Sequence, residues 1–103
     1  MLLGIMIRRD EVLATLARHR DALHGMGVRR LGLFGSVARG EGGGASDLDF
    51  VVDFETKSFD AYMDLRSFLE DLLGSRVDLV LSDAIKPRLR PIITAESVNV
   101  PGL

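Results

Sequence analysis

The stretch from Phe34 to Val52 constrains the fold most, because glycine interrupts its apolar residues and two carboxylates follow. Gly35-Ser36 ends one apolar segment, and Asp47 and Asp49 open the next. Side chains alternate between the two faces of a β-strand, so Asp47 and Asp49 are expected on one face. Like charges at that spacing repel, and a cation between them favours their charged form. The stretch therefore predicts a site for a metal ion and a phosphate.

Length and charge limit the kinds of protein this chain can be. Its 103 residues are enough for one hydrophobic core, so residues 1–103 are predicted to form a single domain. Hydrophobic residues make up 47% and charged residues 27%, which is typical of a folded globular chain. The net charge of -2 and the pI near 5.6 leave no basic field to hold a nucleic-acid duplex. The chain has no cysteine, which excludes disulfides, thiolate metal sites and a cysteine nucleophile.

The apolar start of the chain is too short to be read as a targeting segment. Residues 1–6 are shorter than the core of a signal peptide and have no basic residues ahead of them. No apolar run reaches the length needed to cross a membrane. A reducing, cytoplasmic location is the expectation, and the sequence leaves open whether Met1 or Met6 is the true start.

Hydrophobic periodicity predicts the order helix, strand, strand, helix, strand, helix. The expected helices cover residues 10–25, 58–74 and 89–96, and the expected strands cover 28–34, 47–54 and 76–81. Ser58 is expected to cap the second helix and Gly74 to end it, and Val98 and Val100 to form a docked extended tail. The nearly continuous apolar run Phe50-Val51-Val52 favours a strand that is covered on both faces. The predicted fold class is α/β (α+β), with a small mixed sheet packed by helices.

Three pieces of this sequence suit nucleotidyl transfer when they converge. Gly35 permits close backbone approach, and Ser36 adds a hydroxyl where a helical turn should begin, which favours phosphate oxygens. Asp47 and Asp49 offer the hard oxygen ligands that Mg²⁺ takes beside water and phosphate. Asp78 would be a third carboxylate if its strand lies next to the second strand. Its neighbours are valine and leucine, so an unpaired charge on Asp78 would cost several kcal/mol as an order of magnitude. One or two metal ions would then support an in-line displacement.

These residues resemble the signature of the DNA polymerase β-type nucleotidyltransferase superfamily. The fuller string Gly-Ser-x-Ala-Arg-Gly followed by Ser-Asp-x-Asp is similar to its small branch of minimal nucleotidyltransferases, or MNT-domain proteins, and the resemblance covers nearly the whole chain. The resemblance implies that Gly35 and Ser36 bind nucleotide phosphates and that Asp47 and Asp49 hold Mg²⁺. It also implies that Asp78 is the third acidic residue, placed to activate an acceptor hydroxyl.

The resemblance also implies a biological setting. MNT-domain proteins are commonly antitoxins paired with a HEPN-domain ribonuclease toxin, and the family is expected to transfer AMP from ATP to a tyrosine hydroxyl of that toxin. Two alternatives stay open: a binding-only antitoxin that covers the toxin, and a nucleotidyltransferase acting on a small hydroxylated molecule. No residue identifiably reads the edge of a base, and the three carboxylates do not show whether one or two metal ions bind. The apolar content of so small a chain leaves a homo-oligomer open.

Each candidate residue also has a purely structural interpretation. Asp47 and Asp49 can be strand-end acids satisfied by nearby N–H groups, and Asp78 can pair with Arg76 or with an arginine elsewhere. Ser36 can cap its turn. For Arg39, phosphate contact competes with an ion pair to Asp47 or Glu41. Ser46 is expected in a cap or turn. The two histidines, His19 and His24, are expected to be solvated. The basic cluster of Lys86, Arg88 and Arg90 is expected to be a solvated face, and its alternative use is contact with nucleotide or with an acidic partner surface.

Overall fold

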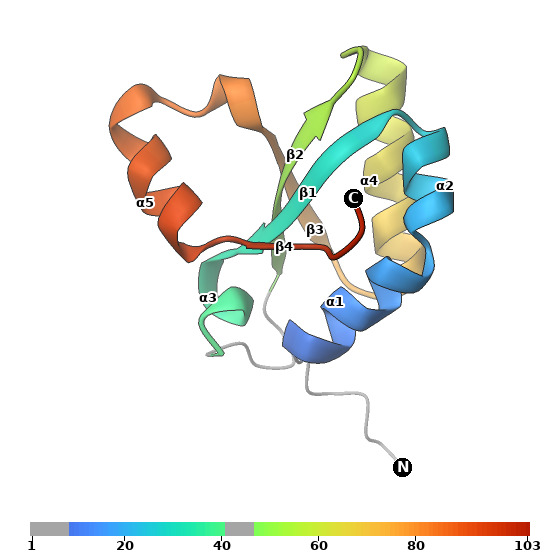
Figure 1. Ribbon diagram of the computed structural model, residues 1–103, viewed down its shortest axis with the longest axis horizontal. Coiled ribbons are helices and arrows are strands. Elements are labelled where there is room, and N and C mark those ends of the chain that lie inside the picture. The colour runs from blue at the N-terminus through green and yellow to red at the C-terminus, as the bar shows by residue number, and fades with distance from the viewer. Residues whose placement is uncertain (1–8, 41–46) are drawn as a thin grey trace.

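The computed structural model describes residues 9–40 and 47–103, which follow the predicted order of helices and strands with shorter helical turns added (Figure 1). The helices are α1 (Arg9–Arg18), α2 (Arg20–Gly25), α3 (Gly35–Ala38), α4 (Phe59–Leu73) and α5 (Arg90–Glu96). The strands are β1 (Val28–Phe34), β2 (Leu48–Phe54), β3 (Val77–Leu81) and β4 (Val98–Asn99). Two 3₁₀ turns, η2 (Ser82–Ala84) and η3 (Pro87–Leu89), lie between β3 and α5. Within the described ranges, no helix combines the length and apolar character needed to cross a bilayer.

The described strands form one mixed sheet in the order β3-β2-β1-β4. β1 pairs antiparallel with both β2 and β4, whereas β2 and β3 are parallel. A parallel pair needs a long crossover, and α4 supplies it between β2 and β3. The prediction of an α/β fold with a small mixed sheet is confirmed.

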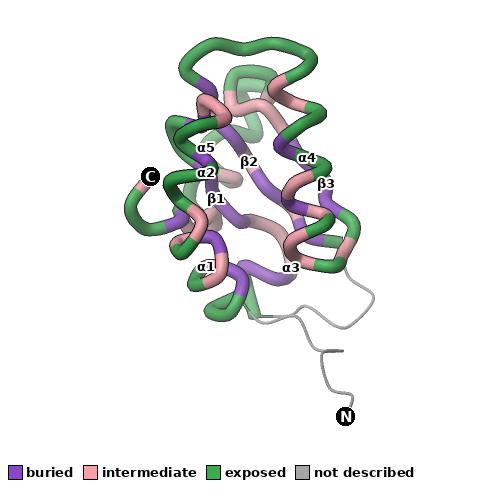
Figure 2. The backbone as a smooth tube through the Cα atoms, turned by 90° about the vertical axis from the view of Figure 1, so that its right-hand side faces the viewer, coloured by how far each residue is buried: buried purple, intermediate pink, exposed green. Residues whose placement is uncertain are grey.

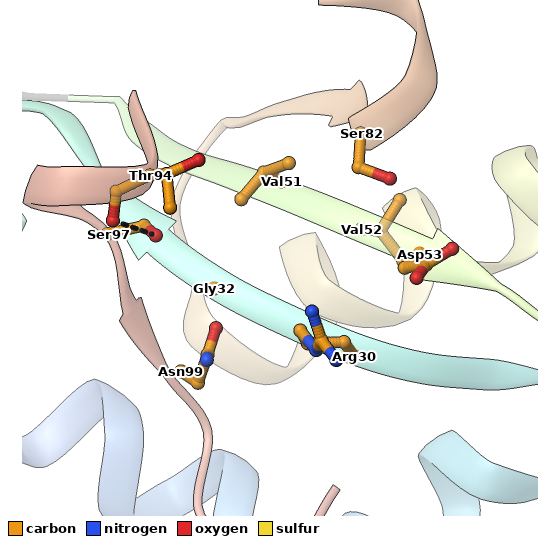
Figure 3. A pocket seen from close by; sticks show the side chains of 9 residues that line it. All are labelled: Arg30, Gly32, Val51, Val52, Asp53, Ser82, Thr94, Ser97 and Asn99. Carbon is orange, nitrogen blue, oxygen red and sulfur yellow. Dashed lines mark hydrogen bonds between the residues drawn. The ribbon is translucent and has the colours of Figure 1, made fainter. Parts of the chain in front are cut away.

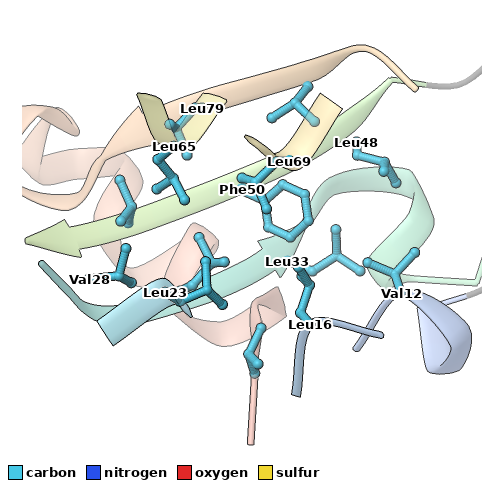
Figure 4. Packing of buried hydrophobic residues seen from close by; sticks show 14 of the residues in the cluster. Val12, Leu16, Leu23, Val28, Leu33, Leu48, Phe50, Leu65, Leu69 and Leu79 are labelled. Atoms are coloured by element: carbon cyan, nitrogen blue, oxygen red, sulfur yellow. The ribbon is translucent and has the colours of Figure 1, made fainter. Parts of the chain in front are cut away.

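The hydrophobic core lies between one face of the sheet and helices α1, α2 and α4, which lie together on the right in Figure 1. Alternate residues of β2 point into it: Leu48, Phe50, Val52 and Phe54 are at most 5% exposed. Figure 2 shows the buried positions running along β1 and β2 through the middle of the molecule. Figure 4 shows Leu16, Leu23, Leu65 and Leu69 from the helices packed around Phe50. Each fully buried side chain of this size stabilises the fold by roughly 1.5–3 kcal/mol.

Local signals predicted the ends of α4 correctly. The Ser58 hydroxyl accepts a hydrogen bond from the Ala61 backbone N–H at 3.0 Å, as an N-cap does. Gly74 ends the helix with a φ of 66°, a left-handed conformation that glycine adopts without steric cost. The predicted helix over residues 10–25 differs, because it divides into α1 and α2 at His19. There the His19 N–H donates to the Leu16 carbonyl three residues back, which tightens the turn.

The opposite face of the sheet is less covered than the apolar run Phe50-Val51-Val52 indicated. Helix α5 and the 3₁₀ turns lie on this side, away from α1, α2 and α4 (Figure 1). Asp49, Val51 and Asp53 of β2 point toward it and are only half-buried. The expectation of cover on both faces holds only in part, because Phe50 and Val52 are buried on the core face whereas Val51 is half-buried on the other face. The carboxylate-bearing face is therefore accessible.

Candidate active site

Gly35 joins β1 to α3 and lies directly against the carboxylate of Asp49. Its φ is +80°, a conformation that side-chain-bearing residues rarely adopt. A Cβ atom placed on Gly35 would lie 2.2 Å from Asp49 Oδ2 and 3.0 Å from Asp49 Cγ. The group that lies close to the Gly35 backbone in the structure is therefore the Asp49 carboxylate. The structure leaves the phosphate-binding roles of Gly35 and Ser36 as predictions.

Asp49 and Asp78 lie opposite one another on adjacent strands. The sheet register pairs Asp49 with Phe34 of β1 on one side and with Asp78 of β3 on the other. Neighbouring strands are about 4.8 Å apart, so the two carboxylates share a small region of the open face. Asp78 is exposed, so it does not carry the burial cost that its Val/Leu-rich sequence suggested. The condition set for a third carboxylate, that β3 lie next to β2, is met.

The electrostatics of Asp49 reflect this crowding. Burial raises the pKa of the Asp49 carboxyl, and the negative charges of Asp78, Asp47 and Glu96 raise that pKa further. The positive charge of Arg39 acts in the opposite direction. Negative charge therefore accumulates around Asp49, and a bound cation would relieve it.

Asp47 precedes β2 and forms an ion pair with Arg76, which precedes β3. The Arg76 Nε atom lies 3.3 Å from Asp47 Oδ1, and the Leu48 N–H donates to the Arg76 carbonyl at 3.0 Å. The sequence had offered Arg76 as a partner for Asp78 instead. Because the Arg76 side chain is 84% exposed, solvent screens the pair and its contribution to stability is small. Asp47 can consequently exchange this partner for another cation at little cost.

Arg39 and Glu96 connect the end of α3 to the end of α5. The Arg39 Nη1 atom donates to Glu96 Oε1 at 2.7 Å across 57 positions of sequence. The sequence had favoured Asp47 or Glu41 as ion-pair partners of Arg39, and Glu41 and Ser46 lie outside the described residues. Glu96 was missed because no local pattern indicates that two such distant residues meet. This pair brings the last turn of α5 to the edge of the carboxylate cluster.

The donor set is suited to a hard cation that a substrate helps to hold. In residues 9–40 and 47–103, no three acidic or histidine side chains are placed to hold a metal ion by themselves. Mg²⁺ is commonly bound through one or two carboxylates, with substrate phosphates and water completing its octahedron. Asp49, crowded by Asp78 and Asp47, offers such a partial set. Assignment of Asp47, Asp49 and Asp78 together as metal ligands stays a prediction.

The remaining candidates lie in ordinary structural settings. His19 is half-buried, its ring nitrogen Nδ1 lies 2.9 Å from the Thr15 carbonyl, and its ring meets Phe68 edge-on at 6.0 Å. These contacts are structural, in agreement with the expectation that His19 is not catalytic. The His19 side chain is nevertheless less exposed to solvent than expected. In the basic cluster, Arg90 donates to the Ile85 carbonyl at 3.3 Å.

Comparison with known proteins gives a consistent result for most of the chain. The profile of the nucleotidyltransferase domain family matches residues 14–100. The chain is 39% identical over 97 residues to the protein adenylyltransferase MntA of Thermococcus cleftensis, covering 92% of this chain and 98% of MntA. A solved structure described as a minimal nucleotidyltransferase is 41% identical with a TM-score of 0.69, over 84% of this chain and 93% of that one.

A chain in a crystal structure of a toxin–antitoxin with AMP-PNP is more distant. It is 25% identical with a TM-score of 0.69, over 88% of this chain and 73% of that one. The family match and the MntA relative each span most of this sequence, and the Gly35, Asp49 and Asp78 cluster lies within the matched range. The chain therefore belongs to the nucleotidyltransferase domain family, in its branch of minimal nucleotidyltransferases related to the protein adenylyltransferase MntA.

Proposed function

We propose that this chain is a Mg²⁺-dependent adenylyltransferase antitoxin that transfers AMP from ATP to a tyrosine hydroxyl of a HEPN-domain toxin. The observation that carries the proposal is the juxtaposition of Asp49 and Asp78 on paired strands, with Asp49 against Gly35. The 39% identity to a protein adenylyltransferase supports the reaction class. The structural similarity to a toxin–antitoxin chain solved with AMP-PNP supports the nucleotide and the kind of partner.

The transfer requires one bond to form and one to break at the α-phosphorus of ATP. The acceptor oxygen bonds to that phosphorus while the bond to the bridging oxygen breaks, and pyrophosphate leaves with the electron pair. The acceptor proton passes to a carboxylate, and Asp78 is suited to take it because it is exposed and lies opposite Asp49 in the sheet. Asp47 and Asp49 would hold Mg²⁺, which when bound neutralises charge on the phosphates.

The position of Asp78 also supports an acceptor that belongs to another molecule. β3 is an outer strand of the described sheet, so Asp78 can be approached from beyond the sheet edge. Asp78 is exposed, and the buried residues of β3 that flank it, Val77 and Leu79, belong to the core on the other face. A hydroxyl presented by a toxin would therefore reach Asp78 without displacing the core.

Co-expression with a HEPN-domain toxin tests the proposal. Intact-mass spectrometry of the purified toxin should show a gain of one or more AMP groups with the parent protein. Asp49→Asn should lower the modified fraction by about 100-fold or more, since it removes a charged group at the reacting phosphate. Asp71→Asn, at an exposed position of α4, is the matched control and should leave the modification unchanged. An unmodified toxin with the parent, or full modification with Asp49→Asn, would refute the proposal.

The same variants separate catalysis from simple covering of the toxin. A binding-only antitoxin would protect cells equally well with Asp49→Asn. We expect Asp49→Asn to co-purify with the toxin and yet fail to restore growth. Restored growth without AMP on the toxin would establish the binding-only function instead.

A further inference from the structure

A groove runs along the open face of the sheet, next to Asp49 and beneath α5. It consists of two hollows of about 180 and 250 Å³ that share Val51, Ser82, Thr94 and Ser97 in their walls. Figure 3 shows Val51 and Gly32 on neighbouring strands, with Thr94, Ser97 and Asn99 beside them. Small-molecule sites usually measure roughly 300–1,000 Å³, so the two hollows together are large enough for part of a ligand.

The floor of the groove depends on glycine at position 32. Gly32 pairs with Val51 of β2 on one side and with Asn99 of β4 on the other. A Cβ atom on Gly32 would lie 3.0 Å from Asn99 Oδ1, 3.3 Å from Val51 Cγ1 and 3.5 Å from Ser97 Cβ. Any side chain here would occupy the floor and crowd the walls. Glycine in the middle of a strand weakens the strand, and it often marks a close approach to a ligand.

The walls supply hydroxyl and amide groups around this apolar floor. Thr94 belongs to α5, Ser97 directly follows that helix, and Asn99 belongs to β4. Asp53 and Arg30 line the far end (Figure 3). A floor of Gly32 and Val51 with polar groups around it fits a ring that carries both apolar faces and polar edges. A sugar bearing hydroxyls fits the same rim.

The location of the groove links it to the carboxylates. Val51 lies two residues beyond Asp49 on the same face of β2, a distance of roughly 7 Å along the strand. Glu96, whose charge acts on Asp49, directly precedes Ser97. One hollow extends over β1 and β4, and the other is walled by Ser82 and Asp83, which follow the end of β3. Asp78 lies nearer the start of β3 and lines neither hollow. A nucleotide with its α-phosphate at Asp49 would thus place its sugar and ring in the groove, leaving Asp78, which lines neither hollow, to the acceptor.

We propose that this groove binds the ribose and base of the donor nucleotide, with Gly32 as its floor and Thr94, Ser97 and Asn99 as its polar contacts. The proposal rests on the function proposed above, because it assumes a nucleotide whose phosphates lie at Asp49. It adds a binding site for the half of the donor that the carboxylates do not contact.

Calorimetric binding of ATP and of inorganic tripolyphosphate, both with Mg²⁺, tests this assignment. The parent should bind ATP more tightly than tripolyphosphate. Gly32→Ala should weaken ATP binding by about 10-fold or more and leave tripolyphosphate binding unchanged, since only the nucleoside meets the added methyl group. Gly25→Ala is the matched control, because an added Cβ at Gly25 would meet no atom within 4 Å and the residue has no positive φ. It should bind both ligands as the parent does.

Thr94→Val provides a second test, at an exposed helical position where the substitution should leave folding unaffected. It should weaken ATP binding by about 2–10-fold, the loss of one hydrogen bond, and Thr56→Val in an exposed loop should not. If Gly32→Ala and Thr94→Val both bind ATP as tightly as the parent, the assignment is overturned. It is also overturned if these variants modify the toxin less at unchanged ATP affinity, because the groove would then hold the acceptor. ATP binding that follows these expectations without AMP transfer would instead refute the proposed function and leave the groove assignment standing.

Discussion

Replacement of Gly35 by alanine tests the geometry of the candidate site directly. Gly35 has a φ of +80°, and its added Cβ would lie 2.2 Å from Asp49 Oδ2. The variant therefore combines two separate perturbations. One is backbone strain at a left-handed position, and the other is displacement of the Asp49 carboxylate.

Each perturbation has a magnitude that follows from the structure. A left-handed conformation costs an alanine about 1–2 kcal/mol, and each kcal/mol lowers the Tm of a domain of this size by roughly 4–8 °C. Ordinary contacts begin near 3.4 Å, so the Asp49 oxygen must move by about 1 Å. Misplacement of a catalytic group by about 1 Å can lower a rate by roughly 100-fold.

Gly74→Ala separates the two effects. Gly74 has a φ of +66° and no atom within 4 Å of an added Cβ, so this variant carries the strain without the clash. Thermal unfolding should show a lowered Tm for both variants. Toxin modification, measured by mass spectrometry below both Tm values, should fall only with Gly35→Ala. Equal transfer rates for the two variants would refute the role of Gly35 in seating Asp49.

Further predictions concern stability and metal binding. In metal-free protein, Asp49→Asn should raise the free energy of unfolding at pH 7, because burial and the neighbouring carboxylates raise the pKa of Asp49 and so disfavour its charge in the folded state. The parent protein is destabilised as the pH rises from 3.8 through the raised pKa of Asp49, because the folded state then has to hold the charged carboxylate. In urea titrations, the difference in free energy of unfolding between Asp49→Asn and the parent should therefore be smaller near pH 4 than at pH 7. An equal difference at both pH values would contradict this. Added Mg²⁺ should raise the Tm of the parent more than that of Asp49→Asn in thermal scans, by mass action on the folded state, and an identical response would argue against Asp49 as a ligand. Phe50→Ala should cost about 3–5 kcal/mol in urea titrations, because Phe50 is fully buried, and a loss below about 1 kcal/mol would be inconsistent with the core.

Local sequence signals predicted the parts of this fold that depend on near neighbours. The cap at Ser58, the stop at Gly74 and the alternation along β2 each involve residues within a few positions of one another. The division of the first helix at His19 was not predicted, since its apolar spacing continues through the break. Coverage of the open face was also overestimated, because an apolar run does not show how much of a strand its neighbours reach.

The sequence alone identified the residues that are predicted to carry the chemistry. Glycine at position 35 and acids at 47, 49 and 78 are chemical identities, and the period of a strand placed alternate acids on one face. Tertiary structure decided which of these groups meet. The parallel pairing of β2 with β3 sets Asp78 opposite Asp49, and the return of α5 brings Glu96 to Arg39 and forms the groove over Gly32. Strand order and helix docking depend on packing between segments far apart in the chain, and no short-range pattern encodes that packing.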